Sequence, residues 1–379
     1  MAISTVSEIT GGALDVTLAG SPDEWRAVSE LWDSLAGPIP FRRWNWADAW
    51  WQQYRGRHDR LCVAIVHGAG GRVAGIAPWY LEQSLGRGRV LRLLGSGEAC
   101  SDHLSILTEP AATVPVARRL ARWLAAEAGH WDLLELDGID AHAPVVDELA
   151  GELGRLGYSP AWRDAGQTWS VDLPEDWAGY ESLVSKSRRT MLQRSLRNEF
   201  ATGRAVLHTV TSPEQFDKAF AILVELDARG GQSSANSGAF GSPRYLEFHR
   251  DVARRLLAEG SLRLLWLELD GQPAAAEYSL LGGGTVYRYH TAVDPALADR
   301  VPGWLSLAGS LRRAIEDGQR RFDFLRSDEP SKSSLGAHAH KLRQLRVVAR
   351  KRSAQLRNAA WQAHSAVQNW ARGGWKKSV

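Results

Sequence analysis

The sequence contains only two cysteines, Cys62 and Cys100, among 379 residues. Two cysteines are too few for the disulfide framework that stabilises many small secreted domains. No apolar run approaches the roughly 20 residues of a membrane-spanning helix. Residues 1–12 lack the basic start and the apolar core of a secretory signal, and no Ser-His-Asp or Cys-His arrangement is evident. These absences argue against a secreted disulfide scaffold and an integral membrane protein, and we expect a cytoplasmic location.

Acidic residues are missing from the C-terminal segment. Residues 341–379 hold ten Lys or Arg and no Asp or Glu, and because the whole chain has a net charge of +3, the remainder carries −7. From residue 349 onward, apolar residues recur on one face of a helical pattern. We expect a basic amphipathic helix that docks on the body, makes a peripheral contact with an anionic membrane surface, or binds RNA.

The order of predicted elements occurs twice. Each series reads strand, glycine-containing turn, strand, strand, helix and strand, and the two series are about 190 to 200 residues apart, which is typical of a tandem duplication. A chain of 379 residues also exceeds the usual size of a single core. We therefore predict domains at 1–165 and 166–348, followed by a basic tail at 349–379. The predicted ranges are 61–66, 73–81, 90–94, 114–128 and 131–136, and then 262–269, 273–281, 285–291, 304–317 and 322–325.

The second series contains Arg300-Val-Pro-Gly303 immediately before its helix. This order resembles the core of the GNAT N-acyltransferase fold, whose Arg/Gln-x-x-Gly-x-Gly/Ala loop and following helix bind the pyrophosphate of acyl coenzyme A. Backbone N–H groups and the helix dipole attract phosphate at such a place. The resemblance implies acetyl-CoA or another acyl-CoA as co-substrate and no metal, although Trp304-Leu305 departs from the pattern. The implied coenzyme-binding residues are Arg300, Val301, Gly303, Trp304 and Leu305.

A longer motif follows at residues 323–332. It is similar to the Asp-Phe-Leu-Arg-Gly-Asp-Glu-x-Tyr-Lys segment of the CelD-like acetyltransferases, which are named for a protein associated with cellulose biosynthesis. Ser327 and Ser331 depart from the family's glycine and tyrosine. The resemblance covers about residues 44–348, and it implies an α/β (α+β) fold of tandem GNAT-like mixed sheets flanked by helices, with a basic C-terminal helix. The matching positions are Asp323, Phe324, Leu325, Arg326, Asp328, Glu329 and Lys332.

Within this motif the resemblance implies three catalytic residues. Lys332 is the candidate that stabilises developing negative charge or holds an anionic substrate, and Asp323 or Glu329 is the candidate that receives a proton. In a parallel-type sheet, ligands gather beyond the carboxyl ends of strands, where this segment begins. Without the family pattern, the same residues read as a solvated acidic turn with a surface lysine.

Further residues are candidates for binding the acceptor. Lys186 and Arg189 belong to a basic helix, Arg229 opens a glycine- and serine-rich loop at 229–241 that is expected to act as a lid or binding loop, and Tyr289 lies on a strand. A solvated face is the competing interpretation of the basic helix. The Ser101-Asp102-His103 trio is interpreted as a turn, and the tryptophans of residues 44–54 are interpreted as core.

Three functions remain open at this point. The first is direct transfer of an acyl group, expected to be acetyl, from acyl-CoA to an amine or hydroxyl of a small-molecule or saccharide acceptor, as in a GNAT-type N-acyltransferase. The second is a Fem-type aminoacyl transferase with aminoacyl-tRNA as donor, which the basic helix and tail favour. The third is a catalytically degenerate binding protein, which the departures from the family motif at Ser327 and Ser331 favour.

Overall fold

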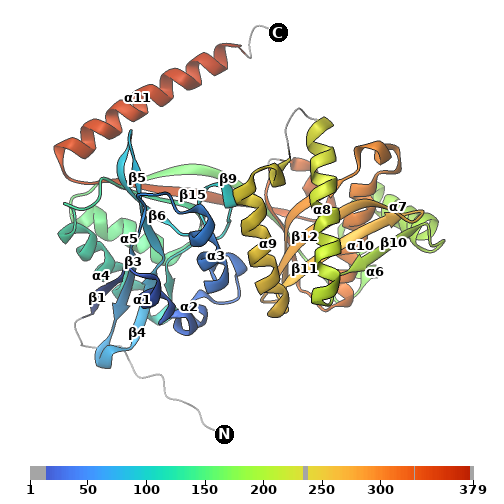
Figure 1. Ribbon diagram of the computed structural model, residues 1–379, viewed down its shortest axis with the longest axis horizontal. Coiled ribbons are helices and arrows are strands. Elements are labelled where there is room, and N and C mark those ends of the chain that lie inside the picture. Colours follow the sequence, from blue (N-terminus) through green and yellow to red (C-terminus); the bar gives the residue numbers. More distant parts are fainter. Residues whose placement is uncertain (1–13, 234–237, 328, 376–379) are drawn as a thin grey trace.

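The computed structural model describes residues 14–233, 238–327 and 329–375 (Figure 1). The motif residue Asp328 lies outside these ranges. The described strands form a four-stranded sheet of order β1-β3-β4-β7 and an eleven-stranded sheet of order β10-β11-β12-β13-β14-β9-β15-β8-β6-β5-β2. Their bounds are β1 (Asp15–Ala19), β2 (Arg60–Leu61), β3 (Val63–His67), β4 (Val73–Ala77), β5 (Trp79–Ser84), β6 (Gly88–Leu93), β7 (Leu107–Thr108), β8 (Leu133–Asp140), β9 (Ala161–Asp172), β10 (Ala205–Thr209), β11 (Leu262–Leu269), β12 (Gln272–Gly282), β13 (Thr285–Val293), β14 (Arg321–Arg326) and β15 (His338–Val348).

Helices surround these sheets. In Figure 1 the first half of the chain lies on the left with α1 to α5, and the second half lies on the right with α6 to α10. The long helix α11 starts beside the first half and extends along the top of the view. Their bounds are α1 (Pro22–Arg26), α2 (Ser29–Ala36), α3 (Trp44–Tyr54), α4 (Thr113–Ala126), α5 (Pro144–Arg155), α6 (Trp177–Leu183), α7 (Lys186–Ser195), α8 (Pro213–Ser233), α9 (Pro243–Ala258), α10 (Pro302–Glu316) and α11 (Arg352–Trp375).

The predicted repeat is present in the strand pairing. In the first half β5 pairs antiparallel with β6, and β6 pairs parallel with β8 after the crossover helix α4. In the second half β12 pairs antiparallel with β13, and β13 pairs parallel with β14 after α10. A parallel pair needs such a crossover, because its two strands run in the same direction. The predicted fold class of mixed α/β sheets flanked by helices is confirmed.

The large sheet is continuous across the two halves. Strands β9 and β15 lie between β14 and β8, and β15 pairs antiparallel with both β8 and β9. The predicted boundary at residue 165 falls inside β9. The last strand of the chain therefore joins the sheet of the first half to that of the second half.

Several local predictions were wrong. The single strand predicted at 73–81 is two strands in two sheets, because Pro78 separates β4 from β5 and has no N–H to donate to a ladder. The predicted loop at 229–241 begins too early, since α8 continues to Ser233, and residues 234–237 lie outside the described ranges. Helix α9 and strand β10 were not predicted. The tryptophans of α3 are core residues, as predicted: Trp46, Trp50 and Trp51 are buried.

The predicted basic helix exists as α11, and its first turns contact the body. Lys351 Nζ lies 2.7 Å and Arg357 Nη1 3.3 Å from the buried carboxylate of Asp132, and Ala354 is buried. Among the described residues, no helix has the length and apolarity to cross a bilayer. The start of the tail is therefore tied to the first half by charge as well as by packing.

Candidate active site

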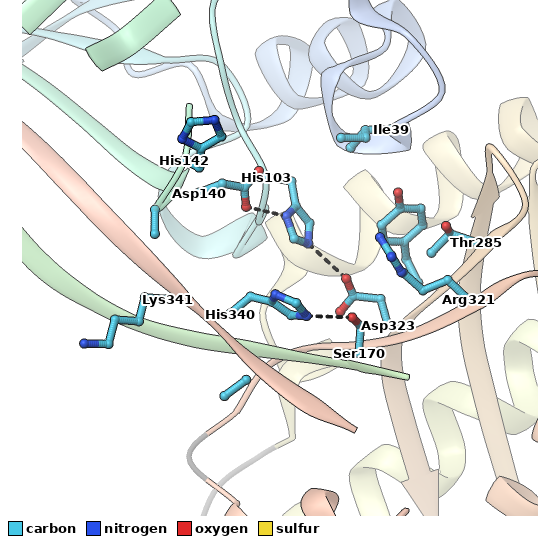
Figure 2. A pocket seen from close by; sticks show the side chains of 13 residues that line it. Ile39, His103, Asp140, His142, Ser170, Thr285, Arg321, Asp323, His340 and Lys341 are labelled. Atoms are coloured by element: carbon cyan, nitrogen blue, oxygen red, sulfur yellow. Dashed lines mark hydrogen bonds and ion pairs between the residues drawn. The ribbon is translucent and has the colours of Figure 1, made fainter. Parts of the chain in front are cut away.

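A cavity of about 570 Å³ lies where the two halves meet (Figure 2). Residues of β13 and β14 line it together with residues from the ends of β8, β9 and β15. Side chains alternate along a strand, and Val286, Phe322 and Phe324 pack with α10 in one apolar cluster. Tyr287 and Asp323 point the other way and line the cavity. The cavity is therefore on the face of the sheet that is turned away from α10.

His103 bridges two carboxylates inside this cavity. Its Nδ1 is 2.6 Å from Asp140 Oδ1, and its Nε2 is 3.2 Å from Asp323 Oδ2, an ion-pair distance without the alignment of a hydrogen bond. Figure 2 shows the ring between the two acids. Burial lowers the pKa of His103, but the two carboxylates outweigh burial and raise the pKa to about 10. At neutral pH the ring is therefore an imidazolium.

Asp140 belongs to the first half and is held from a second side. Arg42 Nη2 lies 3.4 Å from Asp140 Oδ2, and Arg42 Nε donates to the carbonyl oxygen of His103. Burial raises the pKa of Asp140, but the charges of His103 and Arg42 outweigh burial and lower it. The chain Asp140–His103–Asp323 thus holds two carboxylates and one cation in a fixed order across the two halves.

Asp102 fixes the loop that carries His103. Its carboxylate accepts hydrogen bonds from the backbone N–H of Arg326 at 2.8 Å and from Arg326 Nε at 2.9 Å, and the Asp102 residue is only 1% exposed. Both Asp102 and His103 therefore reach from the first half to the end of β14. His103 itself has φ = +61°, in the left-handed region that few residues other than glycine adopt.

The end of β14 is also irregular. Its pairing with β9 shifts register between Asp323 and Arg326, and Leu325 has φ = +57°. The Leu325 N–H donates to Asp323 Oδ1 at 2.7 Å, which fixes the carboxylate. Strand β14 pairs with β13 at only three positions, of which the last joins Tyr287 and Asp323. This bulge orients Asp323 toward His103, as bulges commonly re-aim side chains beside active sites.

The three predicted catalytic residues lie in two places. Asp323 lines the cavity, whereas Glu329 and Lys332 lie in the turn after β14 and do not line it. Lys332 Nζ is 3.9 Å from Glu329 Oε2 and 5.7 Å from the centre of the Phe324 ring, which packs with α10. Burial lowers the pKa of Lys332. Lys332 is thus associated with the α10 face and Asp323 with the opposite face.

A second cavity, of about 440 Å³, lies at the N-terminus of α10. It is formed with α7 and the π-helical turn Leu196–Phe200. Four of the five predicted coenzyme-binding residues line it, namely Arg300, Val301, Trp304 and Leu305. Arg194 and Arg204 line it as well. Helix α10 has 15 residues and begins after Val301, whose φ is +46°, so the first turn of a long helix lies beside cationic side chains.

Two of the predicted coenzyme contacts have structural partners instead. The Arg300 guanidinium lies 3.0 Å from Glu199 Oε2 and 2.9 Å from Asp270 Oδ2. Gly303 does not line the cavity, and a Cβ at this position would lie 3.3 Å from Val293 Cγ1. Glycine at 303 lets α10 pack closely on β13. Arg194, which makes no ion pair among the described residues, is the cation that remains available in this cavity.

The predicted acceptor-binding residues are not brought together. Arg189 donates to the carbonyl oxygens of Glu181 and Ser182 at the end of α6, and Arg229 is paired with Glu225 and Asp294. Tyr289 donates to the carbonyl oxygen of Ala99 and packs among aromatic rings, and Lys186 is exposed on α7. None of these four lines either cavity.

Sequence reasoning missed Asp140 and assigned Asp102 and His103 to a turn. The signal that could have found them is a run of polar residues, Ser101-Asp102-His103, after a predicted strand. Asp140 follows an apolar strand in the same way. The contact of His103 with Asp323 depends on β9 and β15, which lie between the sheets of the two halves. No local sequence pattern indicates this strand pairing.

Comparisons with known proteins agree with this geometry in the second half. Residues 186–333 match the family model described as an acetyltransferase (GNAT) domain, so this stretch is similar to GNAT acetyltransferase domains. No curated protein matches the chain. These comparisons do not test the finer resemblance to the CelD-like family, which stays a prediction.

Two solved structures share the fold over most of the chain. The crystal structure of FemX has a TM-score of 0.57 at 11% identity and covers 79% of this chain and 90% of its own. A conserved protein of unknown function from Bacteroides thetaiotaomicron VPI-5482 has a TM-score of 0.57 at 9% identity and covers 88% of this chain and 100% of its own. At such identities the likeness concerns the fold alone.

Proposed function

We propose that the chain transfers an acyl group, acetyl or another small acyl, directly from acyl-CoA to an amine or hydroxyl of a small-molecule or saccharide acceptor. One observation carries the proposal. In and around a stretch that matches a GNAT acetyltransferase domain, one cavity lies at the N-terminus of α10, the helix that follows β13, and a second lies at Asp323 on the face of the sheet turned away from α10. Direct transfer needs donor and acceptor to approach one another from two sides.

The α10 cavity suits the donor. Arg194 would hold the diphosphate of the coenzyme together with the first turn of α10, because a guanidinium group and a helix N-terminus both favour phosphate. The coenzyme supplies the activated acyl thioester. Lys332, on the α10 face beside Phe324, would stabilise the negative charge that develops on the thioester oxygen.

The cavity between the two halves suits a polar acceptor. Its lining mixes the carboxylates of Asp140 and Asp323 with cationic side chains and with hydroxyl groups; the cationic residues are His103, Arg321 and Lys341. The nucleophile forms a new C–N or C–O bond, the C–S bond breaks with its electron pair on sulfur, and Asp323 receives the proton of the nucleophile. The imidazolium of His103, with Nε2 3.2 Å from Asp323 Oδ2, orients the carboxylate for that step.

A second candidate is an aminoacyl transferase of Fem type, with tRNA as partner. The basic helix α7, which contributes Arg194 to the donor cavity, and the basic helix α11 favour it. The departures at Ser327 and Ser331 favour a third candidate, a binding protein without activity. In that case Asp323 and His103 would serve only to join the two halves.

Native mass spectrometry of the purified protein separates these functions. We expect a bound mass of coenzyme A or an acyl-CoA, and release of free thiol when acetyl-CoA is added with a panel of amino sugars and hydroxyl compounds. A bound tRNA, with no thiol released from any acceptor, would replace the proposal by the second candidate. Coenzyme bound without turnover on any acceptor would favour the third.

A further inference from the structure

We propose that a third cavity, between α11 and the ends of β9 and β15, binds a phosphate group. This cavity has a volume of about 390 Å³. Its lining contains no Asp or Glu. It shares no lining residue with the two cavities of the transfer site, so the proposal does not depend on the proposed function. The polar side chains that converge on it are Arg163, Arg346, Arg350, Gln355, Asn358 and Gln362.

The central cation of this cavity is Arg346 on β15. Its side chain is only 4% exposed, and its Nη1 has no hydrogen-bond partner. Its Nε lies 3.4 Å from Glu135 Oε2, and its Nη2 is 3.4 Å from Asn358 Oδ1 on α11. A buried guanidinium with an unsatisfied N–H is costly unless an anion or another acceptor completes it.

The carboxylate that pairs with Arg346 is shared with two further arginines. Glu135 Oε1 also lies 2.9 Å from Arg87 Nη1 and 3.6 Å from Arg92 Nη2. Burial and the neighbouring positive charges of Arg163, Arg87 and Arg92 lower the pKa of Arg346 against the effect of Glu135. Glu82 also pairs with Arg87 at 2.8 Å and with Arg92 at 3.0 Å, so two carboxylates compensate only part of the charge of these three arginines.

The two other arginines make no ion pair among the described residues. Arg350 Nη1 donates to the carbonyl oxygen of Leu156 at 2.9 Å, and Arg163 lies beside the indole ring of Trp361, 5.9 Å from its centre. The same ring lies 4.5 Å from the Arg346 guanidinium. Trp361 on α11 thus holds two guanidinium groups in place at the cavity without neutralising them.

A phosphate is the anion that best fits this arrangement. Guanidinium groups bind its oxygens in pairs of parallel hydrogen bonds, and the amides of Gln355 and Gln362 add neutral donors at the rim. The phosphate can belong to a small phosphorylated compound or to the headgroup of an anionic lipid. The chemistry of recognition is the same for both sources.

The test is a binding titration on the full chain. Inorganic phosphate and pyrophosphate are titrated calorimetrically in a buffer without phosphate, and vesicles of phosphatidylglycerol with phosphatidylcholine are compared with phosphatidylcholine alone. We expect saturable binding that Arg163→Gln weakens about tenfold or more, because a charged hydrogen bond is lost. Arg352→Gln is the matched control: Arg352 opens α11, is exposed and does not line the cavity.

The arms of the experiment distinguish the two sources. If Arg163→Gln abolishes vesicle binding and inorganic phosphate competes with the vesicles, the ligand is a lipid headgroup. If phosphate or pyrophosphate binds and vesicles do not, the ligand is a soluble phosphorylated compound. Equal weakening by Arg163→Gln and Arg352→Gln, or no binding of phosphate, pyrophosphate and vesicles, would overturn the proposal. Arg346→Gln is informative only if it folds, and Arg163→Gln decides without it.

Discussion

The two halves of the chain repeat one topology but use the loop after their third strand differently. In the second half, the loop after β13 leads into the N-terminus of α10 and forms the wall of a cavity there. In the first half, the corresponding loop after β6 crosses to the other half. There it gives Asp102 to Arg326 and His103 to Asp323. The two corresponding loops thus have different places: one lies at the cavity beside α10, and the other completes the cavity on the opposite face of the sheet.

The two halves also differ in how their strands are divided among sheets. The second half keeps β10 to β14 in one sheet, whereas Pro78 divides the first half between two sheets. The halves are then joined by β9 and β15, which place Asp140 at the end of β8 near Asp323 at β14. The site therefore depends on both halves. Substitutions at residues that only one half contributes test what each half does.

The largest expected effect is on turnover through Asp323. Once an acceptor is found, Asp323→Asn should lower turnover with acetyl-CoA by about two to four orders of magnitude, because a proton acceptor is lost while the shape is kept. Steady-state kinetics of thiol release measure this. Asp217→Asn is the control, since Asp217 is exposed on α8, pairs with Arg254 and does not line the cavity. Equal turnover in both variants would remove Asp323 from the chemistry.

The next effect concerns Lys332 on the α10 face. Lys332→Ala should lower turnover by about two to three orders of magnitude with little change in coenzyme affinity, because a charge that stabilises the oxyanion is lost. The same assay measures it, with Lys218→Ala on the distant helix α8 as control. If Lys332→Ala keeps wild-type turnover, Lys332 does not take part in catalysis. The departures from the family motif at Ser327 and Ser331 would then explain why this segment is inactive.

A smaller effect is expected on stability through the loop of the first half. Asp102→Ala should lower the free energy of unfolding by about 2 kcal/mol, because a buried acceptor of two hydrogen bonds from Arg326 is removed. Urea denaturation measures this. Asp217→Ala removes an exposed pair with Arg254 and should cost less than about 0.5 kcal/mol. Equal costs would show that the crossing loop does not tie the halves together.

A further effect on stability is a pH dependence through His103. The pKa of His103 is raised from 6.5 to about 10 in the folded state, so its contribution to stability is complete below pH 6.5 and is lost as pH rises through about 10. The difference in unfolding free energy between the wild type and His103→Gln should therefore shrink over this range. Urea denaturation at several pH values measures it. A difference that grows with pH would contradict the ion pairs with Asp140 and Asp323.

Part of the lining of the two cavities could be predicted from the sequence. Asp323 lies in the motif after a strand, and Val301, Trp304 and Leu305 lie in the loop before a helix, whereas Lys332 of the same motif lines neither cavity. These are local patterns. Arg300 was predicted to bind the coenzyme, but Glu199 and Asp270 hold it, and those partners come from elements far from it in sequence.

The remainder depends on contacts between the halves. His103 meets Asp140 and Asp323 only because β9 and β15 bring the ends of β8 and β14 together, and strand pairing over such distances leaves no period in the sequence. The prediction of a loop starting at residue 229 was wrong for a local reason. Arg229 forms an i,i+4 pair with Glu225, and α8 continues through the glycines that suggested a turn.

The most direct test of the division between the two faces is a calorimetric titration of coenzyme A into four proteins. The wild type, Arg197→Glu and Asp323→Asn should bind alike, because Arg197 does not line the α10 cavity and Asp323 lies on the opposite face. Arg194→Glu should bind coenzyme A at least about tenfold more weakly, because its charge-assisted hydrogen bond to the diphosphate is lost. Unchanged binding by Arg194→Glu together with loss of binding by Asp323→Asn would place the coenzyme in the cavity between the two halves and contradict the account.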